Sequence, residues 1–352
     1  MTIPESTWSA LATSIRAERT CLVDLRSPGE FATGRIPQAR NLALLDDAER
    51  KTVGTLYKQV SRCEATQTGL ELFAVKAERF LEDLLAARAA KPEYERLVLH
   101  CWRGGMRSGS VARWLTVAGV PCIVLRGGYK VFRREIRGLF EALAQRELLV
   151  LVGRTGSGKT DLLREMLGTV PALDLEGIAR HRGSAFGDFA QSEPCPTQQD
   201  FENQLGDAIH ALGDAPRVLV EIENFIGPVK VPPVLRERMR SAPLLLVERE
   251  FDDRVVRLVA EYAPRWTDEL QKRFEERLEM LAQYLSREVR RTIAGATARG
   301  DFATAVAMLL TLRYDRTYDK TIARTQAQIV GKFNLTRDLD GAREFLKHYL
   351  QR

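Results

Sequence analysis

LLVLVGRTGSGKT, residues 148–160, is the segment that decides the fold of this 352-residue chain. An apolar run leads into GRTGSGKT (153–160), which satisfies the pattern G-x-x-x-x-G-K-[S/T] at every position, and the helical segment DLLREMLG follows. A strand, a glycine-rich loop and a helix in this order are typical of a phosphate-binding loop, in which backbone amides and the helix N-terminus surround an anion. The segment therefore predicts an α/β domain that binds a polyphosphate.

The phosphate-binding loop supplies the residues that we assign to a diphosphate or nucleotide. Lys159 adds a mobile positive charge, and the Thr160 hydroxyl can reach a Mg²⁺ ion that bridges phosphates. The strand RVLVEIEN (217–224) places Glu221 and Glu223 on one face, where they could organise a metal ion or water; the alternative is an acidic pair that caps a neighbouring helix or loop. The assigned loop residues are Gly153, Arg154, Thr155, Gly156, Ser157, Gly158, Lys159 and Thr160.

Other short apolar runs flanked by turn residues predict further strands on both sides of this loop. Helical segments separate these strands, so the pattern predicts mainly parallel sheets with helices on both faces. From residue 251 onward the sequence is predominantly helical, and residues 266–295 form one long amphipathic candidate. The predicted strands lie within residues 20–27, 96–102, 121–128, 170–177, 217–224 and 242–250.

A second glycine-containing loop follows a predicted strand in HCWRGGMRS (100–108). Backbone amides, the dipole of the following helix, and two arginines favour the thiolate of Cys101 over its thiol, so we expect Cys101 to be catalytic. The alternative is a buried core cysteine, which needs neither flanking glycines nor arginines. The expected active-site loop comprises Trp102, Arg103, Gly104, Gly105, Met106, Arg107 and Ser108.

Positive charge is concentrated beside this cysteine. Residues 1–145 hold 22 basic and 16 acidic residues, whereas the rest of the chain is balanced. Between residues 101 and 137, Glu135 is the single acidic residue among eight basic ones. A solvated basic face is one explanation, and a surface for nucleic-acid phosphates is the other. On the second explanation, the candidate nucleic-acid contacts are Arg126, Lys130, Arg133 and Arg134.

Composition limits the class of protein. Hydrophobic residues make up 45% of the chain and charged residues 28%, which is ordinary for a globular protein of two domains. Five scattered cysteines without a C-x-x-C pair argue against a disulfide framework or a zinc site, and we expect no metal cluster. The N-terminus lacks a signal peptide and no run is long enough to span a membrane, so we expect a cytoplasmic protein without a membrane partner. We also expect the protein to be a monomer.

Several motifs resemble known families. The loop HCWRGGMRS, with LVDLRSPGEFATGRIPQARNL (22–42) and VLRGGYKVF (124–132), is similar to rhodanese-like sulfurtransferases. Five residues separate Cys101 from Arg107, one more than in many sulfurtransferases, and this spacing resembles cysteine phosphatases of the same fold. A rhodanese-like domain before a P-loop domain, with VGTLYKQVSR (53–62) and DLEGIARHRGSAFG (174–187), resembles the bacterial tRNA 2-selenouridine synthase family.

The resemblance implies an activity and two co-substrates. The family replaces the 2-thio sulfur of a wobble uridine in tRNA with selenium from selenophosphate, and it is associated with geranylation of that sulfur by geranyl diphosphate. Cys101 would carry selenium as a selenosulfide while its loop binds the departing phosphate, and the P-loop would hold the geranyl diphosphate. A basic group before a Gly-Ser turn would contact the diphosphate or the anticodon stem, or is an ordinary basic loop: Arg180, His181 and Arg182.

These observations give the expected architecture and two competing functions. We expect a rhodanese-like domain over residues 1–137, a linker helix over 138–146, a P-loop α/β domain over 147–250, and a helical C-terminal region over 251–352. A cysteine phosphatase fused to a P-loop kinase-like domain would hydrolyse an aryl phosphate through Cys101. A non-enzymatic RNA-binding module regulated by a nucleotide would keep full activity with Cys101→Ser.

Overall fold

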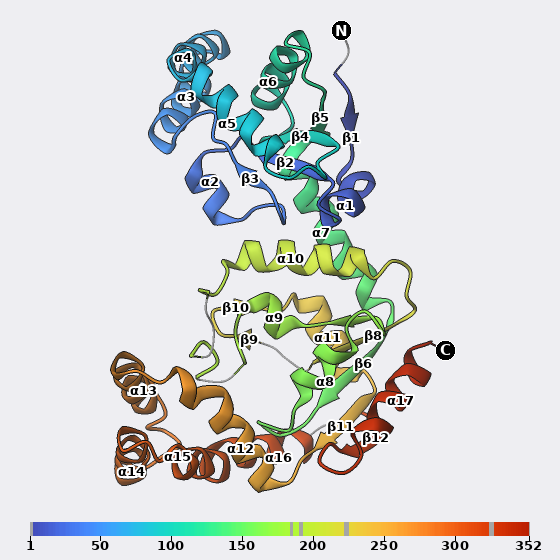
Figure 1. The fold of residues 1–352 in the computed structure, drawn as a ribbon, viewed down its shortest axis with the longest axis vertical. Coiled ribbons are helices and arrows are strands. Elements are labelled where there is room, and N and C mark those ends of the chain that lie inside the picture. Colours follow the sequence, from blue (N-terminus) through green and yellow to red (C-terminus); the bar gives the residue numbers. More distant parts are fainter. Residues whose placement is uncertain (1–2, 184–185, 190–192, 222–224, 324–326, 352) are drawn as a thin grey trace. The chain divides into compact units, whose positions relative to one another are not determined.

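The computed structural model describes residues 3–183, 186–189, 193–221, 225–323 and 327–351. The chain forms two compact units. The N-terminal unit comprises Met1–Leu139 and Thr197–Ala211, and the second unit comprises Phe140–Pro196 and Leu212–Arg352. Each unit is built around its own parallel five-stranded sheet (Figure 1). The α/β fold class predicted from the sequence is therefore confirmed.

The sheet of the N-terminal unit has the strand order β1-β5-β4-β2-β3, and each neighbouring pair is parallel. Its central strands are buried because they are almost wholly apolar, and α5 (Ala77–Ala89) and α6 (Met106–Val117) pack their apolar faces on them. The strands are β1 (Glu5–Ser6), β2 (Thr20–Asp24), β3 (Arg40–Asn41), β4 (Arg96–His100) and β5 (Cys122–Leu125).

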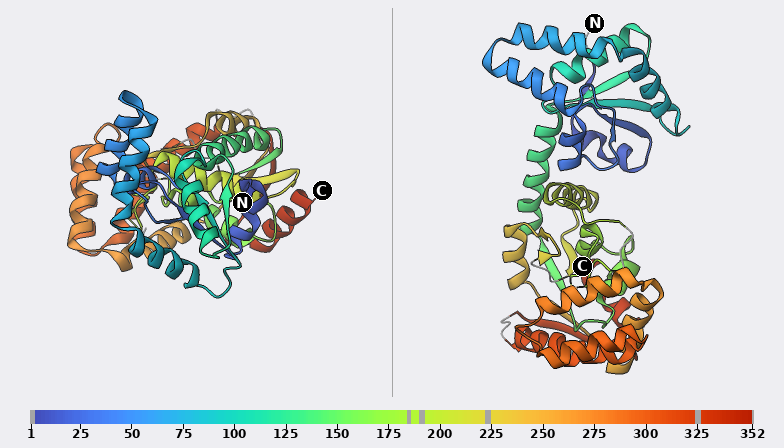
Figure 2. Two further views of the ribbon diagram at one scale, coloured as in Figure 1. Left: turned by 90° about the horizontal axis from the view of Figure 1, so that it is seen from above. Right: turned by 90° about the vertical axis from the view of Figure 1, so that its left-hand side faces the viewer.

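Several of the remaining helices of this unit begin at side chains that accept hydrogen bonds from free backbone amides. The carboxylate of Asp46 accepts a hydrogen bond from the Glu49 amide at 2.8 Å, and Ser61 caps the next helix in the same way at 3.1 Å. Two of these helices, α3 and α4, lie side by side (Figure 2). The helices are α1 (Trp8–Arg16), α2 (Pro28–Thr33), α3 (Asp47–Gln59), α4 (Arg62–Ala74) and α7 (Gly128–Ala144).

Helix α10 (Gln198–Ala211) belongs to the N-terminal unit, although the P-loop precedes it in the chain. Asn203 and Gln199 donate hydrogen bonds to the Tyr129 hydroxyl at 2.7 and 2.8 Å. Gly206 lies so close to Ile136 that an added Cβ would be 2.4 Å from the Ile136 side chain. The sequence predicts one continuous domain over residues 147–250, whereas α10 groups with the N-terminal unit because its buried face contacts α7.

The sheet of the second unit has the strand order β12-β11-β6-β8-β7 and is parallel throughout. Its edge strand β12 was not predicted, since the C-terminal region was expected to be helical. Gly331 in β12 leaves room for Leu245 of β11, 2.8 Å from where a Cβ would stand. The strands are β6 (Glu147–Val152), β7 (Ala172–Leu173), β8 (Arg217–Glu221), β11 (Leu244–Glu248) and β12 (Ile329–Asn334), beside an antiparallel pair, β9 (Phe225–Ile226) and β10 (Val229–Lys230).

The prediction of one long helix over residues 266–295 is wrong. The structure has two helices there, because the Ser286 hydroxyl accepts from the Val289 amide at 3.3 Å and starts a new helix. Leu281 and Leu285 between them are buried in a second core cluster. The helices of this unit are α8 (Lys159–Met166), α9 (Leu175–Ala179), α11 (Pro233–Ser241), α12 (Phe251–Tyr262), α13 (Asp268–Met280), α14 (Arg287–Ala298), α15 (Phe302–Leu309), α16 (Asp315–Ala323) and α17 (Leu339–Gln351), with a 3-10 turn at Ala263–Arg265 and a π-helix at Leu310–Tyr314.

Candidate functional site

The cysteine loop, residues 101–108, connects β4 to α6. Cys101 follows the last residue of β4 and is 3% exposed. Gly104 has a φ of +62° and lies against the turn after β5, where an added Cβ would be 2.8 Å from the Leu125 carbonyl oxygen. At Gly128 an added Cβ would be 2.3 Å from the Cys101 carbonyl oxygen. Glycines from two segments therefore allow the backbone to close tightly around the cysteine.

Two further elements fix the cysteine loop. The Ser108 hydroxyl lies 3.3 Å from Cys101 Sγ, so it can donate a hydrogen bond to the sulfur. The backbone amides of Tyr129 and Lys130, in the first turn of α7, donate to the carbonyls of Cys101 and Trp102 at 2.9 Å each. The loop thus presents its sulfur at the N-terminus of α6, where the helix dipole favours an anion.

The two arginines of the loop have different surroundings. Arg107 Nη1 donates to Glu30 Oε2 at 2.9 Å, and both side chains are half-buried. Burial opposes ionisation of Glu30, but the hydrogen bond and charge of Arg107 outweigh it and hold the pKa of Glu30 below its ordinary value. Arg103 is exposed. Within the cysteine loop, Arg107 is therefore fixed by its ion pair with Glu30, while Arg103 faces solvent.

A buried polar cluster that the sequence analysis missed lies at the ends of β2 and β4. Arg26 Nη2 donates to Asp24 Oδ2 at 2.6 Å, and its guanidinium carbon stands 3.7 Å from the centre of the Tyr129 ring. His100, directly before Cys101, has Nε2 3.6 Å from Asp24 Oδ2, and burial lowers its pKa, so its ring is neutral at pH 7. Charged residues at the end of a buried strand, as in LVDLRS, are the signal that could have found this cluster.

The four candidate tRNA contacts separate into two groups. Arg126, Lys130 and Arg134 are exposed in the N-terminal unit. Arg133 is buried: it donates to Asn203 Oδ1 at 2.6 Å and pairs with the Glu202 carboxylate. The basic pattern suggested Arg133 because sequence alone does not reveal that α10 covers it. Its guanidinium is engaged by these two side chains, which argues against Arg133 as a contact for an external phosphate.

The phosphate-binding loop, residues 153–160, connects β6 to α8. Gly156 and Gly158 have φ of +79° and +91°, a region that favours glycine. A Cβ on Gly153 would be 2.3 Å from the Val247 carbonyl oxygen of β11. Lys159 Nζ donates to the Gly153 carbonyl at 2.9 Å, across the loop. The geometry is that of a loop able to place a lysine and successive amides around a polyphosphate.

Two carboxylates flank Thr160. Its hydroxyl oxygen is 3.1 Å from Glu176 Oε2 and 3.1 Å from Glu221 Oε2. Burial, followed by the charge of Glu176, raises the pKa of Glu221 to about 8, and burial also raises the pKa of Glu176. The second oxygen of Glu221 has no hydrogen-bond partner in the described part of the chain. This donor set fits Mg²⁺, which prefers oxygen ligands. Glu223 lies outside the described residues.

The basic group at residues 180–182 is engaged in internal contacts. Arg180 Nε lies 3.2 Å from Glu193 Oε2, and Arg182 Nε lies 2.9 Å from Glu261 Oε1. His181 is buried, and burial lowers its pKa. Its Nδ1 accepts a hydrogen bond from the Gly183 amide at 3.1 Å. These contacts favour a structural role over the predicted contact with diphosphate or RNA.

Two arginines that the sequence analysis missed hold the phosphate-binding loop from the β11–α12 side. Arg254 is 2% exposed; its Nε donates to the Thr155 carbonyl at 2.9 Å, and its other nitrogens bind the Asp315 carboxylate at 2.6 and 3.0 Å. Arg249 Nε donates to the Ser157 carbonyl at 3.1 Å. The loop is therefore tied to α12 and α16, elements more than 90 residues away from it in the sequence.

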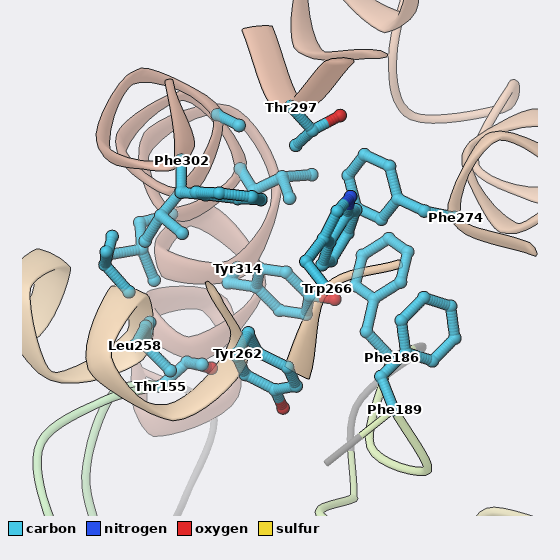
Figure 3. A pocket seen from close by; sticks show the side chains of 15 residues that line it. Thr155, Phe186, Phe189, Leu258, Tyr262, Trp266, Phe274, Thr297, Phe302 and Tyr314 are labelled. Atoms are coloured by element: carbon cyan, nitrogen blue, oxygen red, sulfur yellow. The ribbon is translucent and has the colours of Figure 1, made fainter. Parts of the chain in front are cut away.

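An apolar pocket begins at the phosphate-binding loop (Figure 3). It encloses about 640 Å³, including the part open to solvent, and one residue of the loop, Thr155, lines it. The aromatic residues of this pocket are scattered from 186 to 314, so no local sequence pattern predicts it. The other lining residues are Phe186, Phe189, Leu258, Val259, Tyr262, Trp266, Phe274, Thr297, Phe302, Ala305, Val306, Leu309, Leu310 and Tyr314.

Comparison with known proteins tests the resemblance. The family model of the tRNA 2-selenouridine synthase AAA domain matches residues 146–299, and the family model of the rhodanese-like domain matches residues 7–135. The tRNA 2-selenouridine synthase of Shewanella sp. (strain ANA-3) is 41% identical over 269 residues, which cover 75% of this chain and 70% of that protein. This chain belongs to the tRNA 2-selenouridine synthase family.

Other members of the family give similar values. The tRNA 2-selenouridine synthase of Cupriavidus necator is 45% identical, with 68% of this chain and 65% of that protein covered. The one from Pseudomonas syringae pv. tomato is 40% identical over the same shares. The family and domain types predicted from the sequence are therefore confirmed. Among the described residues, no helix is both long enough and apolar enough to cross a membrane.

Proposed function

We propose that this chain converts 2-thiouridine at the wobble position of tRNA into 2-selenouridine, through an S-geranyl intermediate. The observation that carries the geranyl step is the position of Thr155, which belongs to the phosphate-binding loop and also lines the apolar pocket. An anion site that adjoins an aromatic pocket suits a ligand with a diphosphate head and a hydrocarbon tail. Geranyl diphosphate has this form, and the relatives are named for the selenium product.

The geranyl step would be an alkyl transfer. The C2 sulfur of the uridine forms a bond to C1 of the geranyl group while the bond from C1 to the diphosphate oxygen breaks. Pyrophosphate leaves with the electron pair, so charge develops on the oxygens that Lys159 and the loop amides contact. A Mg²⁺ ion held by Thr160, Glu221 and Glu176 would add a Lewis acid to this anion site.

The selenium step would use the cysteine loop, and electron balance decides its form. Selenium in selenophosphate is already at the oxidation level of selenide. Attack of Cys101 on selenium would oxidise sulfur and expel phosphite, so a selenosulfide with departing phosphate does not balance. Attack on phosphorus forms an S–P bond, breaks the Se–P bond and releases selenide. Selenide then attacks C2 of the uridine, geranylthiol leaves, and water cleaves the S–P bond to give phosphate.

The exposed basic residues beside the cysteine loop would bind the tRNA backbone. Lys130 is tied to the loop through its own backbone amide, and Arg126 and Arg134 are exposed nearby in sequence. Their contacts with phosphates would place the anticodon region near Cys101 and give a salt-dependent affinity.

The proposal is tested by nucleoside mass spectrometry on thiolated tRNA incubated with the purified chain. Geranyl diphosphate alone is expected to give S-geranyl-2-thiouridine. Selenophosphate added after removal of free geranyl diphosphate is expected to convert that nucleoside into 2-selenouridine. Selenophosphate labelled with ³²P distinguishes attack of Cys101 on phosphorus from attack on selenium, because only phosphoryl transfer to Cys101 labels the protein. No modified nucleoside under any condition would overturn the proposed function.

A second candidate function is cysteine-dependent phosphatase activity. The observation that favours it is the five-residue spacing from Cys101 to Arg107, combined with the Ser108 hydroxyl at 3.3 Å from the sulfur. Turnover of p-nitrophenyl phosphate that is lost in Cys101→Ser, together with no modified nucleoside in the tRNA assay, would support this function instead.

A further inference from the structure

The apolar pocket of the second unit is bounded at two opposite ends. Thr155, Leu258 and Tyr262 lie at one end, beside the phosphate-binding loop, whereas Thr297 and Phe302 lie at the opposite end (Figure 3). We infer that the wall formed by Trp266, Thr297 and Phe302 limits the length of the isoprenyl tail, so that the pocket discriminates between isoprenyl diphosphates. This inference rests on the proposed function and names the part of the site that sets its substrate class.

The wall presents hydrocarbon to the pocket. The Thr297 hydroxyl donates to the Ala294 carbonyl at 2.9 Å, and the Trp266 indole nitrogen donates to Gln271 Oε1 at 3.0 Å. Both polar groups are satisfied within the protein, so they offer little to a polar ligand. Burying an isoprenyl tail against such a wall removes apolar surface from water on both sides, which favours a hydrocarbon occupant.

The wall is also held in position. Trp266 packs edge-on against Phe302 and against Phe274, with ring centroids 5.2 Å apart in each case. Phe302 is the first residue of α15, which is capped by the Asp301 carboxylate at 3.1 Å from the Thr304 amide. A cap and an aromatic cluster together restrict how far Phe302 can move when a longer ligand enters.

The opposite end is fixed to the anion site. Arg254 joins the Thr155 carbonyl to Asp315, directly after the π-helix whose residues Leu310 and Tyr314 line the pocket. A diphosphate in the loop and a tail against Phe302 would therefore be held by one connected framework. A fixed head and a fixed wall at the tail are what a length limit requires.

Two variants that change the pocket in opposite directions test the inference. Phe302→Ala lengthens the pocket, and Ala305→Phe fills it; the matched control is Phe345→Ala, a phenylalanine of the same unit that packs in another core cluster. Each full-length protein receives thiolated tRNA and an equimolar mixture of dimethylallyl, geranyl and farnesyl diphosphate. The S-alkylated nucleosides are then quantified by mass spectrometry.

Wild type is expected to favour the geranyl product. Phe302→Ala should raise the farnesyl-to-geranyl ratio by at least about tenfold, and Ala305→Phe should raise the dimethylallyl-to-geranyl ratio by a similar factor, because pockets discriminate about tenfold or more per small hydrocarbon unit. Phe345→Ala should keep the wild-type ratios. Ratios report selectivity within one sample, so a fraction of unfolded protein does not alter them.

Different failures have different meanings. If wild type alkylates tRNA but both pocket variants keep its product ratios, the length limit is overturned while the proposed function stands. If wild type forms no S-alkyl product from any of the three donors, the geranyl step itself fails. A shift in the same direction in Phe345→Ala and Phe302→Ala would show that general loosening of the unit, rather than the wall, sets the ratio.

Discussion

The cysteine loop and the phosphate-binding loop have the same local design, since each joins a buried parallel strand to the N-terminus of a helix. Their surroundings differ. The cysteine loop has a sulfur 3.3 Å from a hydroxyl, with the nearby Arg107 paired to Glu30. The phosphate-binding loop has no nucleophile of this kind; two buried carboxylates and an apolar pocket adjoin it. In the proposed function, one loop therefore takes up a phosphoryl group covalently, and the other holds a diphosphate with a hydrocarbon tail.

An anion-binding loop does not define a reaction by itself. Helix dipole and backbone amides are common to both loops, so they explain binding but not the difference in chemistry. The side chains that follow each loop make the difference. Ser108 approaches the sulfur in one, whereas Thr160 approaches the two carboxylates in the other.

The largest expected effect is that of Cys101→Ser. Selenouridine formation from purified S-geranyl tRNA should fall by more than about a hundredfold, because serine is a far weaker nucleophile. Geranylation of thiolated tRNA should stay within about twofold of wild type. Both rates are measured by nucleoside mass spectrometry over time. Equal loss of both activities would mean that the two loops do not divide the chemistry as proposed.

Lys159→Ala should have the opposite pattern. Removing the lysine from the leaving pyrophosphate should lower the geranylation rate by about a hundredfold. Conversion of already geranylated tRNA into selenouridine should continue at a rate close to that of wild type. The rate of each step, measured with separately prepared tRNA substrates, checks this result, and Lys332→Ala in β12 is the matched control. Normal geranylation by Lys159→Ala would contradict the proposal that the diphosphate binds in the phosphate-binding loop.

Glu221→Gln should change how the stability of the protein depends on pH. The pKa of Glu221 is raised from its ordinary 4.5 to about 8, so the folded state binds this proton more tightly than the unfolded chain. The resulting stabilisation is complete below about pH 4.5 and is lost as pH rises to about 8. Without Mg²⁺, Glu221→Gln should therefore gain stability relative to wild type as pH rises through this window. Denaturant unfolding at several pH values measures the difference.

The same variant should respond weakly to Mg²⁺. In wild type, Mg²⁺ should bind more tightly as pH rises towards 8, since metal binding displaces the proton. Glu221→Gln should lose most of this dependence. The melting temperature with and without Mg²⁺ at pH 7 and pH 8.5 checks it, and an equal upward shift in both proteins would place the metal ion elsewhere.

The smallest effects are expected on the basic surface. Lys130→Ala and Arg134→Ala should each weaken tRNA binding severalfold and lower the slope of log affinity against log salt by about 1. Arg133→Ala should leave that slope unchanged but lower the free energy of unfolding by about 2 kcal/mol, because Glu202 and Asn203 lose a buried partner. Binding is followed by fluorescence anisotropy of labelled tRNA at several salt concentrations. Salt slopes equal to that of wild type in both Lys130→Ala and Arg134→Ala would exclude this surface as the tRNA-binding site.

Sequence alone was sufficient for the elements whose pattern is local. The apolar strands, the two loops and the family could be predicted because each depends on a few consecutive residues. Glu221 was anticipated as a metal or water organiser on a neighbouring strand, while its contact with Thr160 and the presence of Glu176 were not. Whether these residues act as proposed stays a prediction.

The features that were missed depend on contacts between distant segments. Arg254 reaches Thr155 across 99 positions, and Arg133 is covered by a helix 70 positions further along. The pocket collects aromatic side chains from five separate segments, and no short window of sequence contains its pattern. Edge strand β12 was missed for a similar reason, because its partner β11 lies far before it in the chain.

The position of α10 has a consequence for how the protein is made. Residues 197–211 complete the N-terminal unit, but the ribosome must first synthesise the whole phosphate-binding loop and its helix. Until then, Tyr129 and Arg133 lack their partners on α10. Domains of nascent chains generally fold in order from the N-terminus. Here the first unit can finish folding only after translation has passed well into the second, so the two units mature together during synthesis.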